Sequence, residues 1–222
     1  MTVLVEVVHA VKPLTNTVFD KWVDWYGTDV IPAMGRNGFD VLGAFKRSTG
    51  PMGEDVLVVR FDSTADYERA GISLRKDAAF LKSLASVAGA WVVSESVKVA
   101  NIVPYATEQR LEKQLAARPE KPRQYLQAVL RMKYGGQPAT MAALDKLVDI
   151  VDSSGRMALV TAYETSIGQR GELTDLWVSG DGVPDLSYRP GDPMAELVAA
   201  LREGAPEESI SYLNPLPYSK LR

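Results

Sequence analysis

One sequence pattern occurs twice in this chain, and it limits the fold more than any other feature. Residues 44–54 read AFKRSTGPMGE and residues 162–172 read AYETSIGQRGE, so both copies follow A-[FY]-x-x-S-x-G-x-x-G-E without a gap. A second pattern, N-x-x-P-Y, occurs at 101–105 and again at 214–218. A repeat of more than about 100 residues is longer than a solenoid unit and has the size of a small domain. The chain is therefore expected to be a duplicated domain.

The elements expected in each half follow the order β-α-β-β-α-β, which is that of the ferredoxin-like unit. Strands are indicated by runs rich in β-branched residues, and helices by apolar residues at three- and four-residue steps. Ser63, Asp77 and Asp192 are expected to cap helices. The expected elements are strand 2–11, helix 18–31, strands 39–48 and 55–61, helix 63–75 and strand 94–103, then strand 126–134, helix 141–151, strands 157–166 and 172–178, helix 193–202 and strand 209–213.

We predict a first ferredoxin-like unit at 1–106, a linker at 107–123 and a second unit at 124–222. The linker is expected to be helical until a stiff hinge with two prolines, Pro119-Glu120-Lys121-Pro122. A four-stranded sheet with helices on one face leaves its other face bare, so that face needs a second sheet. The predicted fold class is therefore α+β, with two tandem ferredoxin-like units packed sheet to sheet as an internal α+β barrel.

The two halves differ most after residue 178. The first half passes from strand to helix through Asp62 and Ser63, whereas the second uses the long Gly-, Asp- and Pro-containing segment 179–191. A loop of this length inside a compact domain is a lid, a binding loop or a disordered segment.

Composition excludes several classes of protein. A formal charge of -3 and a pI near 5.3 give no electrostatic basis for binding nucleic acid or an anionic membrane. The absence of cysteine excludes disulfides, thiolate catalysis and cysteine-ligated metals, and it fits a reducing cytoplasm. No apolar run approaches the roughly 18 residues that would span a bilayer, and the apolar N-terminus carries Glu6 with no preceding basic region, so no signal peptide is expected.

His9 is the only histidine, and it lies in phase with Val3, Val5 and Val7 on the first strand. It could be a strand-end histidine satisfied by the backbone, or a general acid or base near neutral pH. A third reading is a haem ligand. Since no metal-binding motif occurs around this one histidine, we expect neither a metal site nor another bound cofactor.

Three charged residues on predicted strands are further candidates. Glu6 shares a face with Leu4 and Val8, and the first and third strands of a ferredoxin-like unit are adjacent, so Glu6 and Arg60 are expected to form an ion pair. Alternatively, Glu6 is a base with a raised pKa, and Arg60 holds a substrate carboxylate or enolate. Arg131, on the first strand of the second half, is either part of a structural pair or an anion-binding residue.

Aromatic residues crowd the first predicted helix as Trp22, Trp25 and Tyr26, and Trp91 precedes the fourth strand. Aromatic residues at helical spacing usually pack in a core. The three on the helix cannot all point the same way, so at least one is expected to face a cavity, a partner or solvent. Together with Trp177 on a strand of the second half, they are candidates for binding a flat, apolar ligand.

The two G-x-x-G segments, Gly50–Gly53 and Gly168–Gly171, join strand to strand. A phosphate-binding loop would instead lead into a helix N-terminus. Both are therefore predicted to be hairpin turns.

These turns and their flanks carry a family resemblance. Leu42-Gly43-Ala44-Phe45, Gly50-Pro51, the strand 56–61, Tyr67-Glu68-Arg69-Ala70 and the closing N-x-x-P-Y resemble the NIPSNAP family, over most of the first half and more thinly over the second. The family's usual Arg and Tyr on the first strand fall here at Val7 and His9, and Val59 stands where Trp is usual. The resemblance implies the dimeric α+β-barrel superfamily, which includes cofactor-free monooxygenases, haem-degrading proteins, isomerases and cyclases.

Three functions follow as hypotheses. The first is a cofactor-independent enzyme that acts on an apolar or aromatic, polyketide-like carbonyl compound by proton transfer, cyclisation or isomerisation, or oxygenation. In it, His9 or Glu6 is the base, Arg60 or Arg131 stabilises an enolate, and the aromatics bind the substrate. The second is a non-catalytic ligand-binding or protein-interaction module, and the third a haem-binding protein. A small apolar or aromatic molecule is the expected partner, and a homodimer is a further expectation.

Overall fold

The protein is described by a computed structural model that covers all residues except 1, 13–14, 52, 88–89, 181–190 and 192. Most of the predicted 179–191 loop, and the predicted cap Asp192, therefore lie outside the described residues. The chain divides into two compact units. Unit 1 consists of Met1–Ala100 and Asn214–Leu221, and unit 2 of Asn101–Leu213 with Arg222.

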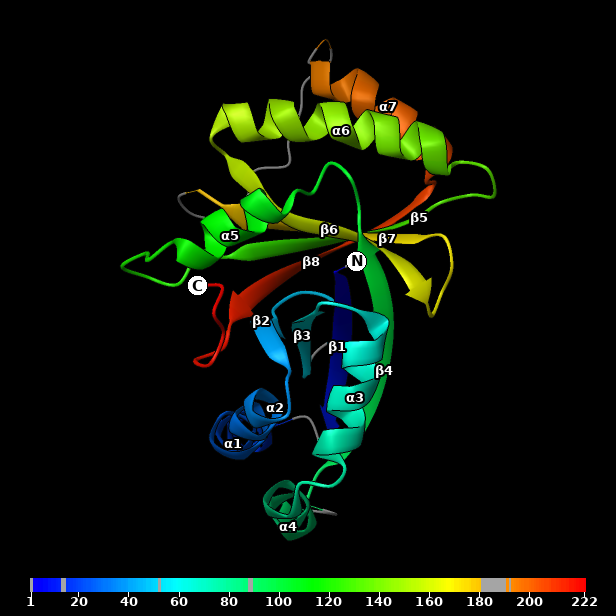
Figure 1. The fold of residues 1–222 in the computed structure, drawn as a ribbon. Helices are drawn as coiled ribbons and strands as arrows, with labels where there is room; N and C mark the ends of the chain where they lie inside the picture. The colour runs from blue at the N-terminus through cyan, green and yellow to red at the C-terminus, as the bar shows by residue number, and fades with distance from the viewer. Residues whose placement is uncertain (1, 13–14, 52, 88–89, 181–190, 192) are drawn as a thin grey trace. The chain divides into compact units, whose positions relative to one another are not determined.

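The described elements repeat the order β-α-β-β-α-β twice, as predicted (Figure 1). The first helix is divided into α1, a π-helical turn η1 and α2, and a further helix, α5, lies between the two sets. The elements are β1 Val3–Lys12, α1 Asn16–Trp25, η1 Tyr26–Val30, α2 Ile31–Arg36, β2 Asp40–Arg47, β3 Glu54–Phe61, α3 Thr64–Leu74, α4 Ala78–Val87, β4 Val92–Ile102, α5 Glu108–Ala116, β5 Tyr125–Arg131, α6 Gln137–Ser154, β6 Met157–Ile167, β7 Glu172–Ser179, α7 Pro193–Gly204 and β8 Glu207–Pro215.

The strands follow one hydrogen-bonded order that closes on itself as a barrel, β1-β3-β2-β8-β5-β7-β6-β4. In unit 1, β3 pairs antiparallel with both β1 and β2. In unit 2, β7 pairs antiparallel with both β5 and β6. Helices and strands are both well represented, so the predicted α+β fold class with a closed barrel is confirmed.

Both G-x-x-G segments are hairpin turns, as predicted. Gly53 and Gly171 have φ angles of 79° and 77°, a left-handed conformation that residues with a Cβ atom rarely adopt. The two hairpins share another detail, because the register shifts between Val41 and Gly43 in one and between Leu159 and Thr161 in the other. These bulges lie 118 positions apart, which is the spacing of the repeated pattern. The shared glycines therefore serve the backbone of the hairpins.

Helix starts follow the predicted caps where these are described. The side chain of Ser63 accepts a hydrogen bond from the Asp66 N–H at the start of α3. Asp77 accepts from the backbone N–H groups of Ala79 and Phe80 at the start of α4. Side-chain oxygens at these positions satisfy N–H groups that the helix itself leaves unpaired.

The first helical segment continues beyond Pro32, where the sequence predicts its end. Pro32 lies in the first turn of α2 but inside one continuous helical stretch, because Val30 and Ile31 have α-helical dihedrals and the Ile31 N–H donates to the Tyr26 carbonyl of η1. The π-helical turn η1 precedes it and begins at Tyr26, just after Trp22 and Trp25. Turns of this kind are rare in proteins overall, and those that occur are often found at functional sites.

The C-terminal segment Asn214–Leu221 belongs to unit 1, although the repeat pattern assigns it to the second half. The N–H groups of Leu216 and Leu221 donate to the carbonyl oxygens of Ala44 and Leu42 at 2.8 and 3.0 Å. Tyr218 also packs closely on η1, since a Cβ atom on Gly27 would lie 2.8 Å from its ring. Backbone hydrogen bonds to β2 thus hold the second N-x-x-P-Y segment in unit 1.

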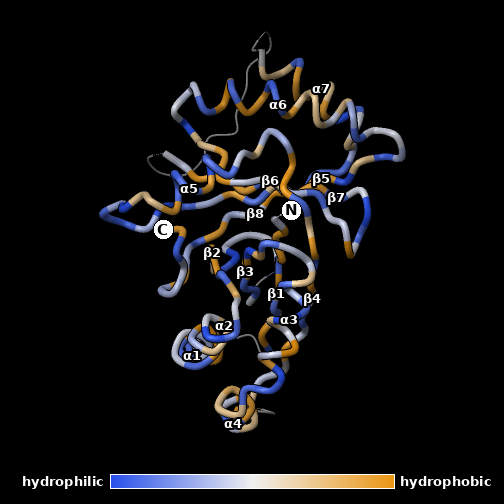
Figure 2. The backbone as a smooth tube through the Cα atoms, in the orientation of Figure 1, coloured by the Kyte–Doolittle hydropathy of each residue, from blue (hydrophilic) through white to orange (hydrophobic). Residues whose placement is uncertain are grey.

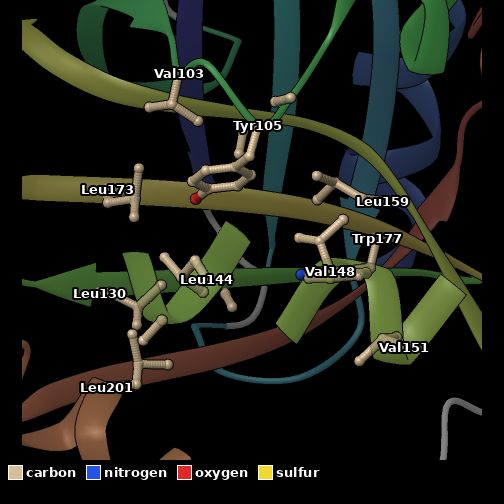
Figure 3. Close-up of a cluster of buried hydrophobic side chains, with 14 of the residues drawn as sticks. Val103, Tyr105, Leu130, Leu144, Val148, Val151, Leu159, Leu173, Trp177 and Leu201 are labelled. Carbon is tan, nitrogen blue, oxygen red and sulfur yellow. The ribbon is translucent and has the colours of Figure 1, made fainter. Parts of the chain in front are cut away.

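Unit 2 has its own apolar core. The helices α6 and α7 lie side by side and pack on each other (Figure 1). Figure 3 shows Tyr105 and Trp177 among the aliphatic side chains of this core, which include Leu130, Leu144 and Leu173. The predicted linker helix is present as α5, which packs on β6.

In unit 1 the helix α4 is apolar but not buried. Figure 2 colours α4 mostly as hydrophobic, yet none of the residues 78–87 is buried. Across the described part of the chain, no helix combines the length and apolar character required to cross a membrane.

Candidate active site

A cavity of about 590 Å³ lies within unit 1, between the strands and the helices. Its floor is formed by alternate residues of β1, namely Val5, Val7 and His9, and by residues of β3. The helical segments α1, η1, α2, α3 and α4 and the strand β4 contribute the other walls. The apolar exposed face of α4 is thereby explained, because Phe80, Leu84 and Val87 line this cavity.

Aromatic rings form much of the wall. The four predicted aromatic residues of the first half, Trp22, Trp25, Tyr26 and Trp91, all line the cavity. Trp91 contacts Trp22 edge to face at 6.0 Å and Trp25 at 5.9 Å between ring centroids. Trp22 and Tyr26 are buried, whereas Trp25 and Trp91 are partly exposed. The structure therefore gathers all four around one cavity.

His9 lies in the cavity wall with a carboxylate at each ring nitrogen. Asp55 is its direct cross-strand neighbour on β3, and neighbouring side chains of this kind lie close together. His9 Nδ1 lies 3.0 Å from Asp55 Oδ1, and His9 Nε2 lies 3.2 Å from Glu95 Oε2. The indole N–H of Trp22 donates to the other oxygen of Asp55 at 3.3 Å. His9 is thus held by side chains of β3 and β4 rather than by the backbone.

These carboxylates decide the charge of the imidazole. Burial by itself lowers the pKa of His9, but the hydrogen bonds and negative charges of Asp55 and Glu95 raise it to about 9. The hydrogen bond from His9 in turn lowers the pKa of Glu95. Both nitrogens therefore carry hydrogen at neutral pH, with Nδ1–H donating to Asp55 and Nε2–H to Glu95.

The protonated state revises two of the roles considered for His9. An imidazolium has no free lone pair, so at neutral pH His9 is a hydrogen-bond donor and a positive charge rather than a general base. For the same reason it does not fit as an axial ligand of haem iron, which requires a neutral ring nitrogen. The arrangement is instead suited to stabilising negative charge on an oxygen atom in the cavity.

Stability should depend on pH through this group. A pKa raised from 6.5 to about 9 means that the folded protein binds the proton more tightly than the unfolded chain. The contribution of His9, about 3 kcal/mol, should be fully present below pH 6.5 and lost as the pH rises through 9. Urea unfolding of the wild type and of His9→Gln at pH 6, 7.5 and 10 measures it, and a difference between the two that stays constant with pH would contradict the assignment.

Glu6 and Arg60 lie outside this cavity wall. Alternation along a strand turns them to the face opposite that of Val5, Val7 and Val59. Glu6 forms an ion pair with Lys98 at 2.9 Å, and Arg60 forms one with Asp40 at 2.8 Å. The register explains the second pair, because Asp40 stands directly opposite Arg60 on β2, whereas Glu6 stands opposite Val58.

The two candidates of the second half belong to unit 2. Arg131 lies directly opposite both Glu172 and Glu207 on its neighbouring strands and pairs with them at 3.9 and 3.3 Å. It is exposed and has the surroundings of a structural ion pair. Trp177 is buried in the core of unit 2 and lines a smaller cavity there.

Asp55 and Glu95 are the site residues that the sequence-based reasoning missed. One signal for Asp55 was available, because it lies in phase with Leu57, Val59 and Phe61 and so places a charge on the apolar face of a strand. Glu95 had no such signal. Its strand reads SESVKV and alternates polar and apolar residues without marking which face meets His9.

Comparisons with known proteins show the same fold. A candidate monooxygenase from Fusobacterium nucleatum is 12% identical, with a TM-score of 0.67 over 97% of this chain and 92% of that one. An anthrone oxidase-like protein is 10% identical, with a TM-score of 0.63 over 96% of this chain and 91% of that one. A NIPSNAP family protein from Agrobacterium tumefaciens is 10% identical and covers 47% of this chain and 95% of that one, with a TM-score of 0.42.

No family model and no curated protein matches the sequence. At identities near 10% the likeness shows the fold alone, so any function must come from the site.

Proposed function

We propose that the protein is a small-molecule enzyme whose unit 1 cavity binds a flat aromatic carbonyl compound and catalyses proton transfer from a carbon atom that the carbonyl acidifies, either directly or through the conjugated ring. The observation that supports it best is the imidazolium of His9, held by two carboxylates in the wall of an aromatic-lined cavity. A developing enolate is the kind of charge that such a fixed cation stabilises.

The size and lining of the cavity support the substrate class. A volume of about 590 Å³ lies within the range of roughly 300–1,000 Å³ that is usual for small-molecule sites. Indole and phenol rings offer flat faces for stacking, and few polar groups interrupt them. Proteins of the same fold include a candidate monooxygenase and an anthrone oxidase-like protein, and the second name suggests a flat aromatic ketone as a probe.

The residues present allow a balanced reaction. The substrate oxygen would take the place of Glu95 as acceptor of the Nε2–H of His9, which frees the Glu95 carboxylate inside the cavity. Glu95 then accepts the proton from the substrate carbon while the electron pair moves onto the oxygen as an enolate. Return of that proton to the oxygen or to another carbon gives the isomer and restores Glu95. Asp55 is a positioning residue, since it holds the imidazolium in place from Nδ1.

An oxygenation can follow from the same enolate when dioxygen is the second substrate. The enolate carbon transfers electrons to dioxygen and forms a C–O bond, and loss of water then leaves one oxygen atom in the product as a new carbonyl. The carbon is oxidised and dioxygen is reduced, so no bound cofactor is needed. The shared step is the proton transfer, which is therefore the step to test.

Anthrone is a suitable probe, because it is a three-ring ketone with acidic C–H groups opposite the carbonyl. In D₂O under nitrogen, we expect the wild type to accelerate exchange of these hydrogens, as followed by NMR. His9→Gln and Glu95→Gln should each slow the catalysed exchange by about 10²-fold or more, since a positioned acid or base contributes that much. Glu68→Gln, an exposed glutamate on α3 outside the cavity wall, is the matched control and should exchange at the wild-type rate.

The exchange experiment also distinguishes the proposed enzyme from the second function that the sequence left open, a non-catalytic binding module. Saturable binding of anthrone with exchange no faster than in buffer would reject the enzyme and favour that module. Equal rates for Glu95→Gln and Glu68→Gln would reject the role of Glu95. Oxygen uptake in air, measured with the same variants, shows whether oxygenation follows.

A further inference from the structure

Unit 2 contains a second, smaller cavity that the proposed function does not use. Its volume is about 200 Å³, and most of its wall is aliphatic, with Trp177 as its aromatic residue. The strands β5, β6, β7 and β8 and the helices α6 and α7 contribute the lining. Three charged residues also line it, namely Asp175, Arg202 and Glu208.

Asp175 is the unusual member of this wall. It lies on β7 in phase with Leu173 and Trp177, and its residue is only 2% exposed. The hydroxyl of Tyr105 donates to its Oδ1 at 3.0 Å. Among the residues that the structure describes, its Oδ2 has no hydrogen-bond partner. One oxygen of a buried carboxyl group thus remains available in an apolar cavity.

The other half of the chain shows that the fold does not require a carboxyl group here. Asp175 follows the repeated pattern at the position that Leu57 occupies 118 residues earlier. Leu57 is fully buried in the core of unit 1. A buried carboxyl group without full hydrogen bonding is destabilising, so its presence in only one half indicates a use. Burial also raises the pKa of Asp175 to about 7, as is common at functional sites.

We propose that this cavity is a second binding site, for a single-ring apolar molecule whose hydroxyl or amino group donates a hydrogen bond to Asp175. Size sets the first limit, since a cavity of about 150 Å³ holds one benzene ring and this one is about 200 Å³. Polarity sets the second limit. Tyr105 already donates to one oxygen, and a donor from the ligand would satisfy the other.

The methionines allow the two cavities to be followed separately. Met157 and Met194 line the unit 2 cavity, whereas Met34 lines the unit 1 cavity. In the full chain labelled with ¹³C at the methionine methyl groups, we would titrate phenol as the probe and toluene as a ring of similar size without a donor. Phenol should shift the signals of Met157 and Met194 and bind about tenfold more tightly than toluene. The signals are assigned with Met157→Leu and Met194→Leu.

The double variant Asp175→Leu, Tyr105→Phe replaces the carboxyl group of Asp175 by leucine, which is the residue that the first half has at the equivalent position, Leu57. In this variant the preference for phenol should be lost. At pH 8, where Asp175 is mostly ionised and cannot donate, benzaldehyde, which accepts but does not donate, should bind the wild type no better than toluene. No shift of Met157 or Met194 up to the solubility limit of phenol would overturn the site, and equal affinities for phenol and toluene in the wild type would overturn the role of Asp175. Both readings use the wild type, so they stand even if the variant fails to fold.

This site is independent of the proposed function. Anthrone exchange depends on His9 and Glu95 in unit 1, so a failure there leaves the phenol result unchanged. Conversely, the double variant in unit 2 should retain anthrone exchange if unit 1 is intact. The two failures are therefore distinguishable.

Discussion

Replacing Asp55 by alanine is expected to lower the free energy of unfolding at pH 7 by about 3–5 kcal/mol, the range found when one partner of a buried ion pair is removed. Asp55 is fully buried, and it accepts from both His9 and the indole N–H of Trp22. Its loss leaves two buried donors without their acceptor. The pKa of His9 should also fall, because burial lowers it and the hydrogen bond to Asp55 no longer opposes that effect.

Urea unfolding measures the stability, and an NMR titration of the single histidine measures the pKa. The control is Glu95→Gln at the other ring nitrogen. The Glu95 side chain is 59% exposed, so its pair with His9 should contribute no more than about 1 kcal/mol. Similar small losses in both variants would mean that the His9–Asp55 pair does not hold the site together.

In unit 2 the opposite effect is expected. Replacing Asp175 by leucine together with Tyr105→Phe should raise the free energy of unfolding at pH 8 by about 1–4 kcal/mol, as seen when buried ionic groups are replaced by apolar ones of similar volume. The double variant removes the buried carboxyl group and also the hydroxyl that would otherwise lose its acceptor. Urea unfolding of both proteins provides the comparison.

The pH dependence of this gain follows from the raised pKa of Asp175. Because the folded protein binds the proton more tightly than the unfolded chain, the wild type loses stability as the pH rises from about 4 to 7. Glu208, which also lines the cavity, opposes ionisation of Asp175, whereas the hydrogen bond from Tyr105 favours it. The advantage of the double variant should therefore be small at pH 4 and largest at pH 8. An advantage that does not grow with pH would show that Asp175 is not a destabilising buried charge.

The fold could be predicted from the sequence because its signals are local. Caps such as Ser63 and turn glycines such as Gly53 and Gly171 act within a few residues, and each marks one boundary. The continuation of the first helix past Pro32 was missed, since a π-helical turn depends on packing around Tyr26 rather than on a short motif. The return of Leu216 and Leu221 to β2 was missed for a similar reason, because these contacts join distant parts of the chain.

The site could be predicted only in part. The alternation of apolar residues placed His9 with Val5 and Val7 on one face of β1, which is the face of the cavity. The partners of His9 could not be predicted, because they depend on the register between β1 and β3 and on the path of β4. For the same reason the sequence did not give Lys98 as a partner of Glu6 or Asp40 as a partner of Arg60, since adjacency of two strands does not say which residues stand opposite each other.

The most direct test is the ¹⁵N NMR spectrum of the imidazole at pH 7.5, recorded without and with anthrone. His9 is the only histidine, so both ring signals belong to it and only Nδ1 and Nε2 have to be told apart. We expect both nitrogens of the free protein to be protonated, and anthrone to shift the Nε2 signal strongly as its acceptor changes from Glu95 to the ketone oxygen. A neutral imidazole in the free protein, or a spectrum that saturating anthrone leaves unchanged, would contradict the proposed role of His9.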